Sequence, residues 1–133
     1  MSQENVEVAR AAIAAWNAGD MERLRELYDP DATMHYKGSS DWLESGPYLG
    51  RDAIMRQFRW LRETWDRDSL QIVGDLLAAG DRVVVRATWR VAGHGPGGEL
   101  EMAWVYTVRR RLIVRADFFR DYGEALEAVE LRE

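Results

Sequence analysis

One acidic residue, Asp117, lies in the otherwise largely apolar segment 112–119 near the end of the chain, where a carboxylate could do chemistry. Successive side chains of a β-strand point to opposite faces, so Asp117 shares a face with Ile113 and Arg115. If that face lines a pocket, the carboxylate is desolvated and binds a proton more readily, which suits a general base. The alternative is an ion pair between Asp117 and Arg115. Both faces of this segment are partly apolar, so the choice of face stays open.

Aromatic side chains supply the other part of a possible site. The segments 82–91 and 99–108 read as neighbouring strands, and they place Trp89 and Trp104 together on one concave face. Aromatic rings with polar tips can stack on a flat apolar ligand and orient it by hydrogen bonds. We expect Tyr36 and Tyr106 to donate those hydrogen bonds, with Tyr36 beside Asp117 in the catalytic set. The expected binding residues are Trp16, Phe58, Trp65, Trp89, Met102, Trp104, Tyr106 and Arg115.

Other chemistries lack the residues they need. The two histidines, His35 and His94, have no zinc-ligand spacing, and the chain has no cysteine. If Tyr36 points into a pocket, its neighbour His35 points away from it. The glycine-rich stretch 93–98 joins two strands and does not open a helix, as a phosphate-binding loop would. We therefore expect no metal and no nucleotide cofactor.

These residues need a framework, and the hydrophobic periodicity predicts one. Helices are expected from Ser2 to Gly19, in a short segment after Asp20, and around residues 54–65, with an extended segment at 32–36. The period then changes to two, and strands are predicted over 70–78, 82–91, 99–108 and 112–119. A last helix is expected over 124–131. The turn Arg109-Arg110-Arg111 is unusual, because tight hairpin turns favour residues that tolerate positive φ.

Length, composition and charge limit the classes of protein. The chain of 133 residues has 47% hydrophobic and 31% charged residues, as expected for a single domain over residues 1–133. A net charge of −5 argues against a nucleic-acid partner. No apolar run is long enough to span a membrane and no signal peptide is apparent, so a soluble cytoplasmic protein is expected.

Five motifs, in this order and spacing, resemble the SnoaL-like proteins of the nuclear transport factor 2-like superfamily. They are Ala15-Trp16-Asn17-Ala18-Gly19-Asp20, Asp29-Pro30-Asp31-Ala32, Gly46-Pro47-Tyr48-Leu49-Gly50-Arg51, Ala79-Gly80-Asp81-Arg82-Val83-Val84-Val85 and Ile113-Val114-Arg115-Ala116-Asp117-Phe118-Phe119. The resemblance covers essentially the whole chain. It implies an α+β fold in which a strongly curved antiparallel sheet packs on N-terminal helices around a conical pocket, and a homodimer packed through the sheet.

The resemblance does not carry a known active site across. The three catalytic positions of ketosteroid isomerases correspond to Tyr36, Ala12 and Trp104 in this sequence. Limonene epoxide hydrolase activates water with one Arg and two Asp residues, and only one of these three positions is kept in this sequence, as Asp117. SnoaL-like polyketide cyclases also use an acid on the last strand as their base. Steroid isomerisation is therefore not expected.

Two functions stay open on the sequence. The first is an enzyme that acts on a hydrophobic cyclic compound by proton transfer or water activation at Asp117, as an isomerase, cyclase or hydrolase. The second is a protein that binds an apolar metabolite in the same pocket without chemistry, because a lone acid rarely completes an active site. A third possibility, a scaffold, would require an interior packed solid with Trp side chains.

Overall fold

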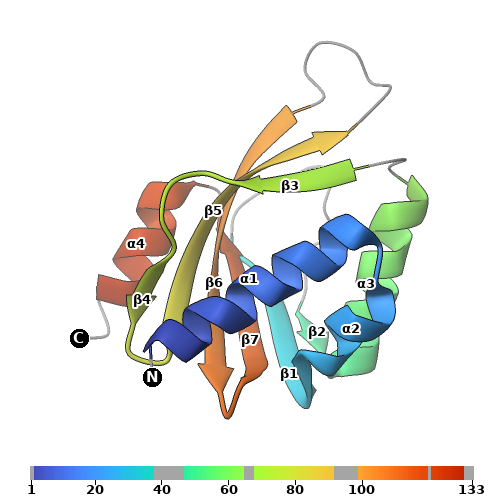
Figure 1. Cartoon of the computed structure of the whole chain (residues 1–133), viewed down its shortest axis with the longest axis horizontal. Coiled ribbons are helices and arrows are strands. Elements are labelled where there is room, and N and C mark those ends of the chain that lie inside the picture. Colours follow the sequence, from blue (N-terminus) through green and yellow to red (C-terminus); the bar gives the residue numbers. More distant parts are fainter. Residues whose placement is uncertain (1, 38–46, 65–67, 92–98, 120, 131–133) are drawn as a thin grey trace.

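The structure is a computed structural model, and it describes residues 2–37, 47–64, 68–91, 99–119 and 121–130. Helices form most of the first half and strands most of the second (Figure 1). In chain order the elements are α1 (Ser2–Ala18), α2 (Met21–Glu26), β1 (Tyr28–Tyr36), β2 (Tyr48–Leu49), α3 (Arg51–Thr64), β3 (Asp68–Ile72), β4 (Leu77–Ala79), β5 (Arg82–Val91), β6 (Glu99–Arg109), β7 (Leu112–Phe119) and α4 (Tyr122–Glu130).

One curved sheet organises the molecule. Its strands lie in the order β2-β1-β7-β6-β5-β3, and β4 pairs with the other end of β5. The β5, β6 and β7 strands form the antiparallel meander that the sequence predicts, whereas β1 joins β7 in parallel. The helix α1 crosses the concave face, α3 packs against β1, and α4 lies on the opposite face (Figure 1). This is the α+β cone expected from the sequence.

The turn between α1 and α2 follows directly from its residues. Gly19 has a φ of +71°, which an L side chain rarely adopts, and its N–H donates to the Trp16 carbonyl. The Asp20 N–H donates to the Ala15 carbonyl, so two orphan carbonyls at the end of α1 are satisfied. The Asp20 carboxylate then caps α2 by accepting from the Arg23 N–H at 3.0 Å. The chain reverses here and begins β1 only two residues after α2.

Two strand boundaries differ from the sequence prediction. The predicted strand over 70–78 is divided into β3 and β4, because Gly74 has a φ of +71° and breaks the extended backbone. The first strand begins at Tyr28, four residues earlier than expected. Its pairing with β7 is irregular between Tyr28 and Thr33, and Pro30, which cannot donate to a ladder, falls within that irregularity.

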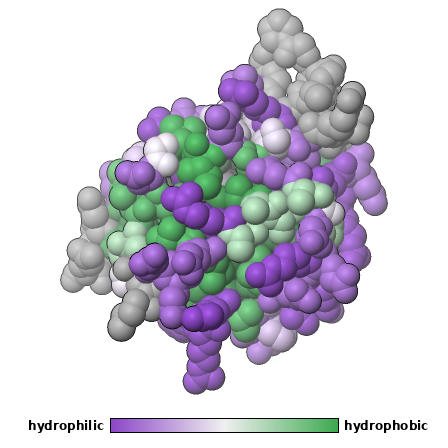
Figure 2. All heavy atoms as spheres, in the orientation of Figure 1, coloured by the Kyte–Doolittle hydropathy of each residue, from purple (hydrophilic) through white to green (hydrophobic). Residues whose placement is uncertain are grey.

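The sheet carries a hydrophobic cluster on each of its faces. The main core fills the concave side, where Val83, Val85, Trp104 and Ile113 pack against α1 and α3. A smaller core lies on the other face, where Val84, Ala103 and Val105 pack against α4. The exterior view of Figure 2 shows polar side chains over much of the α1 side, with hydrophobic residues visible between them. On the concave side, the structure confirms the alternation predicted for β5 and β6, because Trp89, Trp104 and Tyr106 lie inside the cone.

The arginine turn is a tight two-residue turn between β6 and β7. Arg110 and Arg111 have φ values of 53° and 64°, a region that favours Asn and Gly. Flanking ion pairs join Arg109 to Asp81 at 3.2 Å and Arg111 to Glu4 at 3.1 Å. The turn therefore holds local strain at the expected place.

Replacing Arg110 with Asn and Arg111 with Gly should stabilise the protein. Asn and Gly tolerate a positive φ better than Arg does, which stabilises the variant by on the order of 1 kcal/mol per residue. The loss of the exposed ion pair between Arg111 and Glu4 offsets little of this gain. We expect the melting temperature to rise by about 7 °C in thermal unfolding followed by circular dichroism. Arg109→Asn, which removes a charge at ordinary φ, is the control. An unchanged or lower melting temperature in the double variant would contradict the strain.

Candidate functional site

A cavity of about 60 Å³ lies between the concave face of the sheet and the helices. Its walls come from eight elements, so it exists only in the folded chain. The lining residues are Ala12, Ile13, Trp16, Leu24, Tyr28, Tyr36, Phe58, Leu61, Leu70, Trp89, Met102, Trp104, Tyr106 and Phe118. This space is several times what one water molecule needs, and its surface is mostly apolar.

The aromatic rings of the lining form two connected groups. On the helix side, Phe58 meets Trp16 and Tyr28 edge to face, with ring centroids 5.4 and 6.0 Å apart. On the sheet side, the Phe118 ring lies 5.3 Å from Tyr36 and 5.2 Å from Trp104. Packed rings of this kind have few free rotamers, so packing restricts how these walls can rearrange.

Most of the predicted site residues line this cavity, whereas their roles stay predictions. The lining includes Tyr36, Trp16, Phe58, Trp89, Met102, Trp104 and Tyr106. Trp65 and His94 lie outside the described residues. Ala12, at a position that the resemblance assigns to a lost catalytic tyrosine, also faces the cavity. The two remaining residues, Asp117 and Arg115, lie elsewhere.

Asp117 is on the opposite face of the sheet, and this corrects its expected placement on the cavity wall. It lines an open depression on the outer face together with Arg115, Lys37 and Thr107. The Arg115 Nε donates to both carboxylate oxygens of Asp117, at 3.1 and 2.9 Å. The ion pair considered as the alternative is therefore the arrangement in the structure, and Phe118 is the inward residue beside it.

A β-bulge explains the reversal. The register between β6 and β7 shifts so that Val108 pairs with Ile113 but Thr107 pairs with Arg115, which leaves Val114 as an extra residue. Strict alternation places Ile113 and Asp117 on one face. The extra residue turns everything after it to the other face, so Ile113 is inside and Asp117 is outside.

His35 lies on the outer side, as its position next to Tyr36 predicts. Its Cα pairs with that of Asp117 across the β1–β7 ladder, and its Nε2 lies 3.3 Å from the Thr33 hydroxyl. Burial lowers the pKa of His35, and the nearby Arg115 guanidinium acts in the same direction. This histidine is therefore not a group of the aromatic cavity.

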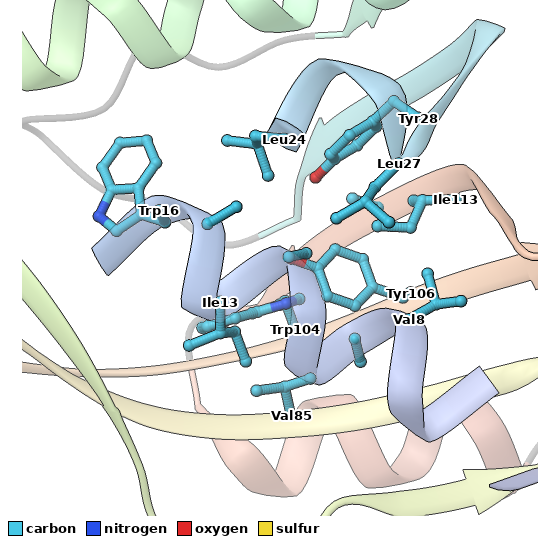
Figure 3. Packing of buried hydrophobic residues seen from close by; sticks show 14 of the residues in the cluster. Val8, Ile13, Trp16, Leu24, Leu27, Tyr28, Val85, Trp104, Tyr106 and Ile113 are labelled. Carbon is cyan, nitrogen blue, oxygen red and sulfur yellow. The ribbon is translucent and has the colours of Figure 1, made fainter. Parts of the chain in front are cut away.

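Three polar groups converge inside the cavity. The Tyr28 hydroxyl and the Trp104 Nε1 are fully buried and have no hydrogen-bond partner among the described residues. The Tyr106 hydroxyl lies beside both and makes weak hydrogen-bonding contact with them, short of the geometry of a regular hydrogen bond. Figure 3 shows the three side chains around one interior space. Burial raises the pKa of Tyr106 to about 12 and raises that of Tyr28 well above 10. Both phenols therefore stay protonated and can donate.

Asp68 is a carboxylate in direct contact with the cavity walls, and the sequence did not single it out. Its side chain is 2% exposed, and its Oδ2 accepts from the Trp16 Nε1 at 2.5 Å and the Trp89 Nε1 at 2.6 Å. Alternation offered a signal, because Asp68 shares a face with Leu70 and Ile72 at the start of β3. Within the described ranges, no three His, Asp or Glu side chains come close enough together to hold a metal ion.

Comparison with known proteins agrees with this architecture. Residues 9–116 match the family model of the SnoaL-like domain, so the chain belongs to the SnoaL-like domain family. No curated protein sequence matches the chain. Among the described residues, no helix combines the length and apolar character that a membrane crossing requires.

Solved structures show the same NTF2-like fold at low identity. Bal32a, from a soil-derived mobile gene cassette, is 24% identical, with a TM-score of 0.78 and coverage of 96% of this chain and 97% of that one. An NTF2-like protein of unknown function from Burkholderia pseudomallei is 21% identical, with a TM-score of 0.75 and coverage of 95% and 97%. IdmH from Streptomyces antibioticus, a proposed polyketide cyclase, is 24% identical, with a TM-score of 0.70 and coverage of 95% and 98%.

Proposed function

We propose that this protein binds a small, mostly apolar cyclic molecule in the aromatic cavity and orients it through a carbonyl or similar acceptor oxygen. The observation that carries the proposal is the pair of buried donors at Tyr28 and Trp104, which make no regular hydrogen bond and have only weak contact with the Tyr106 hydroxyl among the described residues. A buried donor without a partner costs about 1–3 kcal/mol, and a bound acceptor would recover that cost.

The donors in the cavity determine which kind of polar group the ligand must carry, namely a hydrogen-bond acceptor. An indole N–H can only donate, and a phenol held in its protonated form offers a hydrogen to the same point. A ligand that brings a donor to this position would leave the Trp104 Nε1 unsatisfied. Ketones, quinones and lactones carry the matching group, whereas amines and plain hydrocarbons do not.

Binding without proton abstraction is favoured over the original enzyme hypothesis. The cavity lining within the described residues contains no acid, and Asp117 is paired with Arg115 on the other face. Asp68 lies behind the walls, where two indole N–H groups and Arg62 engage it. A general base must reach the proton it removes, and neither of these carboxylates lines the cavity.

Cyclase-like catalysis is the second candidate, and the same donors favour it. Neighbours of this fold include proteins proposed to be polyketide cyclases and a ketosteroid isomerase. A carbon between two carbonyls is acidic enough to ionise in water, so polarising the acceptor carbonyl would accelerate a ring closure without a protein base. In a linear triketone the carbon between two carbonyls can attack the third, and water leaves. Release of the cyclised, dehydrated product, detected by mass spectrometry, would favour this candidate over binding alone.

A pair of ligands tests the proposal. 1-Tetralone and tetralin share a ring skeleton, and only the ketone carries an acceptor oxygen. We expect 1-tetralone to bind the wild type about tenfold more tightly than tetralin in calorimetric titrations. Tyr28→Phe should abolish most of this preference, because it removes one donor and keeps the ring.

Asp117→Asn is the matched control for that experiment. Its side chain lies on the outer face, so binding of both compounds should stay within about twofold of the wild type. Equal affinities for the two compounds in the wild type, or no binding of either, would refute the proposal. A loss of ketone binding in Asp117→Asn would restore this acid to the site.

A further inference from the structure

A single carboxylate oxygen joins two walls of the cavity. Asp68 begins β3, and its Oδ2 accepts a hydrogen bond from Trp16 of α1 and another from Trp89 of β5. Both indole rings line the cavity, but Asp68 itself does not. The two tryptophans come from segments 73 residues apart in the sequence, so they have no local reason to share an acceptor.

Arg62 completes the cluster from α3. Its Nη1 lies 3.6 Å from Asp68 Oδ1 and 2.8 Å from the Trp16 carbonyl, to which it donates. Its guanidinium also lies over the Trp16 ring, 4.7 Å from the ring centroid. The buried carboxylate therefore has a cationic partner on one oxygen and two neutral donors on the other, which compensates its desolvation.

We infer that Asp68 is a positioning residue that fixes the orientation of two cavity walls, and that ligand affinity depends on it although it does not touch the ligand. This inference rests on the proposed function, since it concerns the same cavity. An indole held at its N–H cannot rotate about χ2 without breaking that bond, so each ring keeps its face toward the cavity. Stacking on a flat ligand depends on the ring plane, which links Asp68 to affinity.

A neighbouring contact provides a control that separates positioning from general stability. Asn17, next to Trp16, also ties α1 to β3: its Nδ2 donates to the Leu70 carbonyl at 2.8 Å, and its Oδ1 accepts from the Leu70 N–H at 2.7 Å. Asn17→Ala breaks this tie and leaves both indole hydrogen bonds in place. It should lower stability without changing ligand affinity.

Two substitutions at Asp68 separate hydrogen bonding from charge. In Asp68→Asn the amide oxygen can take the place of Oδ2 and keep both indole bonds, while the ion pair with Arg62 is lost. In Asp68→Leu all of these contacts are lost. We expect 1-tetralone affinity to stay within about threefold in Asp68→Asn and to fall about tenfold in Asp68→Leu.

Nuclear magnetic resonance of the indole N–H groups gives a readout that does not depend on ligand binding. In the wild type and Asp68→Asn, the Trp16 and Trp89 signals should exchange slowly with solvent. They are assigned by single substitutions to Phe. In Asp68→Leu they should exchange fast, while the Trp104 signal is unchanged. Asn17→Ala should give the wild-type pattern.

The outcomes distinguish the positioning role of Asp68 from the proposed binding function of the cavity. Fast exchange of both signals in the wild type would overturn the positioning role, even if Asp68→Leu does not fold. Wild-type affinity in Asp68→Leu, or an equal loss in Asn17→Ala, would overturn it as well. Failure of 1-tetralone to bind the wild type would remove the proposed function and the effect on affinity with it, whereas the exchange data would still report whether Asp68 holds the two rings.

Discussion

The free energy of unfolding should fall steeply above pH 10, because the buried Tyr28 and Tyr106 and the partly buried Tyr36 resist ionisation. Burial raises the pKa values of Tyr28 and Tyr36 well above 10 and that of Tyr106 to about 12. In the unfolded chain these phenols ionise near pH 10, so above that pH the unfolded state binds fewer protons than the folded state. The contribution of these tyrosines to the free energy of unfolding is therefore fully present below pH 10. It is lost as the pH rises toward the pKa values of the tyrosines in the folded state.

The expected size of this effect is several kcal/mol. A tenfold change in an acid constant corresponds to about 1.4 kcal/mol, so Tyr106 alone accounts for on the order of 3 kcal/mol by pH 12. Denaturant unfolding between pH 8 and 11, together with tyrosinate absorbance, would measure it. Tyr106→Phe should flatten the dependence. A wild-type free energy that stays constant above pH 10, or an unchanged slope in Tyr106→Phe, would contradict burial of the phenol.

Substitutions of Trp104 should separate packing from recognition. Trp104 is 1% exposed and packs against Tyr106 and Phe118, so Trp104→Ala should lower the free energy of unfolding by about 3–5 kcal/mol. Trp104→Phe keeps an aromatic ring and removes an unpartnered buried N–H. Its stability should therefore stay within about 1.5 kcal/mol of the wild type, while 1-tetralone binding weakens about tenfold.

Denaturant unfolding and calorimetric titration of both Trp104 variants would test this pair of effects. Tetralin is the control ligand, because it has no oxygen to accept a hydrogen bond, and its affinity for Trp104→Phe should match that for the wild type. Full ketone affinity in Trp104→Phe would show that the indole N–H does not contact the ligand. A Trp104→Ala variant as stable as the wild type would contradict tight packing around the ring.

Local patterns predicted most of the framework. The helical spacing before Gly19 and the two-residue alternation of β5 and β6 placed Trp16, Trp89 and Trp104 on the sides where the structure has them. These are short-range signals, since burial of one face of a helix or strand leaves a period in the sequence. The five ordered motifs likewise identified the SnoaL-like fold. Homodimer formation through the sheet stays a prediction.

The acidic groups could not be placed from the same patterns. One extra residue at Val114 reverses the faces of β7, and an isolated sequence gives no reliable sign of a bulge. The enzyme hypothesis therefore required Asp117 inside, whereas the structure pairs it with Arg115 outside. Asp68 was overlooked because its partners, Trp16 and Trp89, are 52 and 21 residues away.

The sequence by itself determined the cone, the aromatic character of its interior and the positions of most of the rings. Only the tertiary structure decided which polar groups face that interior. The physical reason is that an apolar face leaves a periodic pattern along its own segment, whereas a hydrogen bond between distant segments depends on register and on bulges. The cavity that results has two unpartnered donors and an acid held behind its walls.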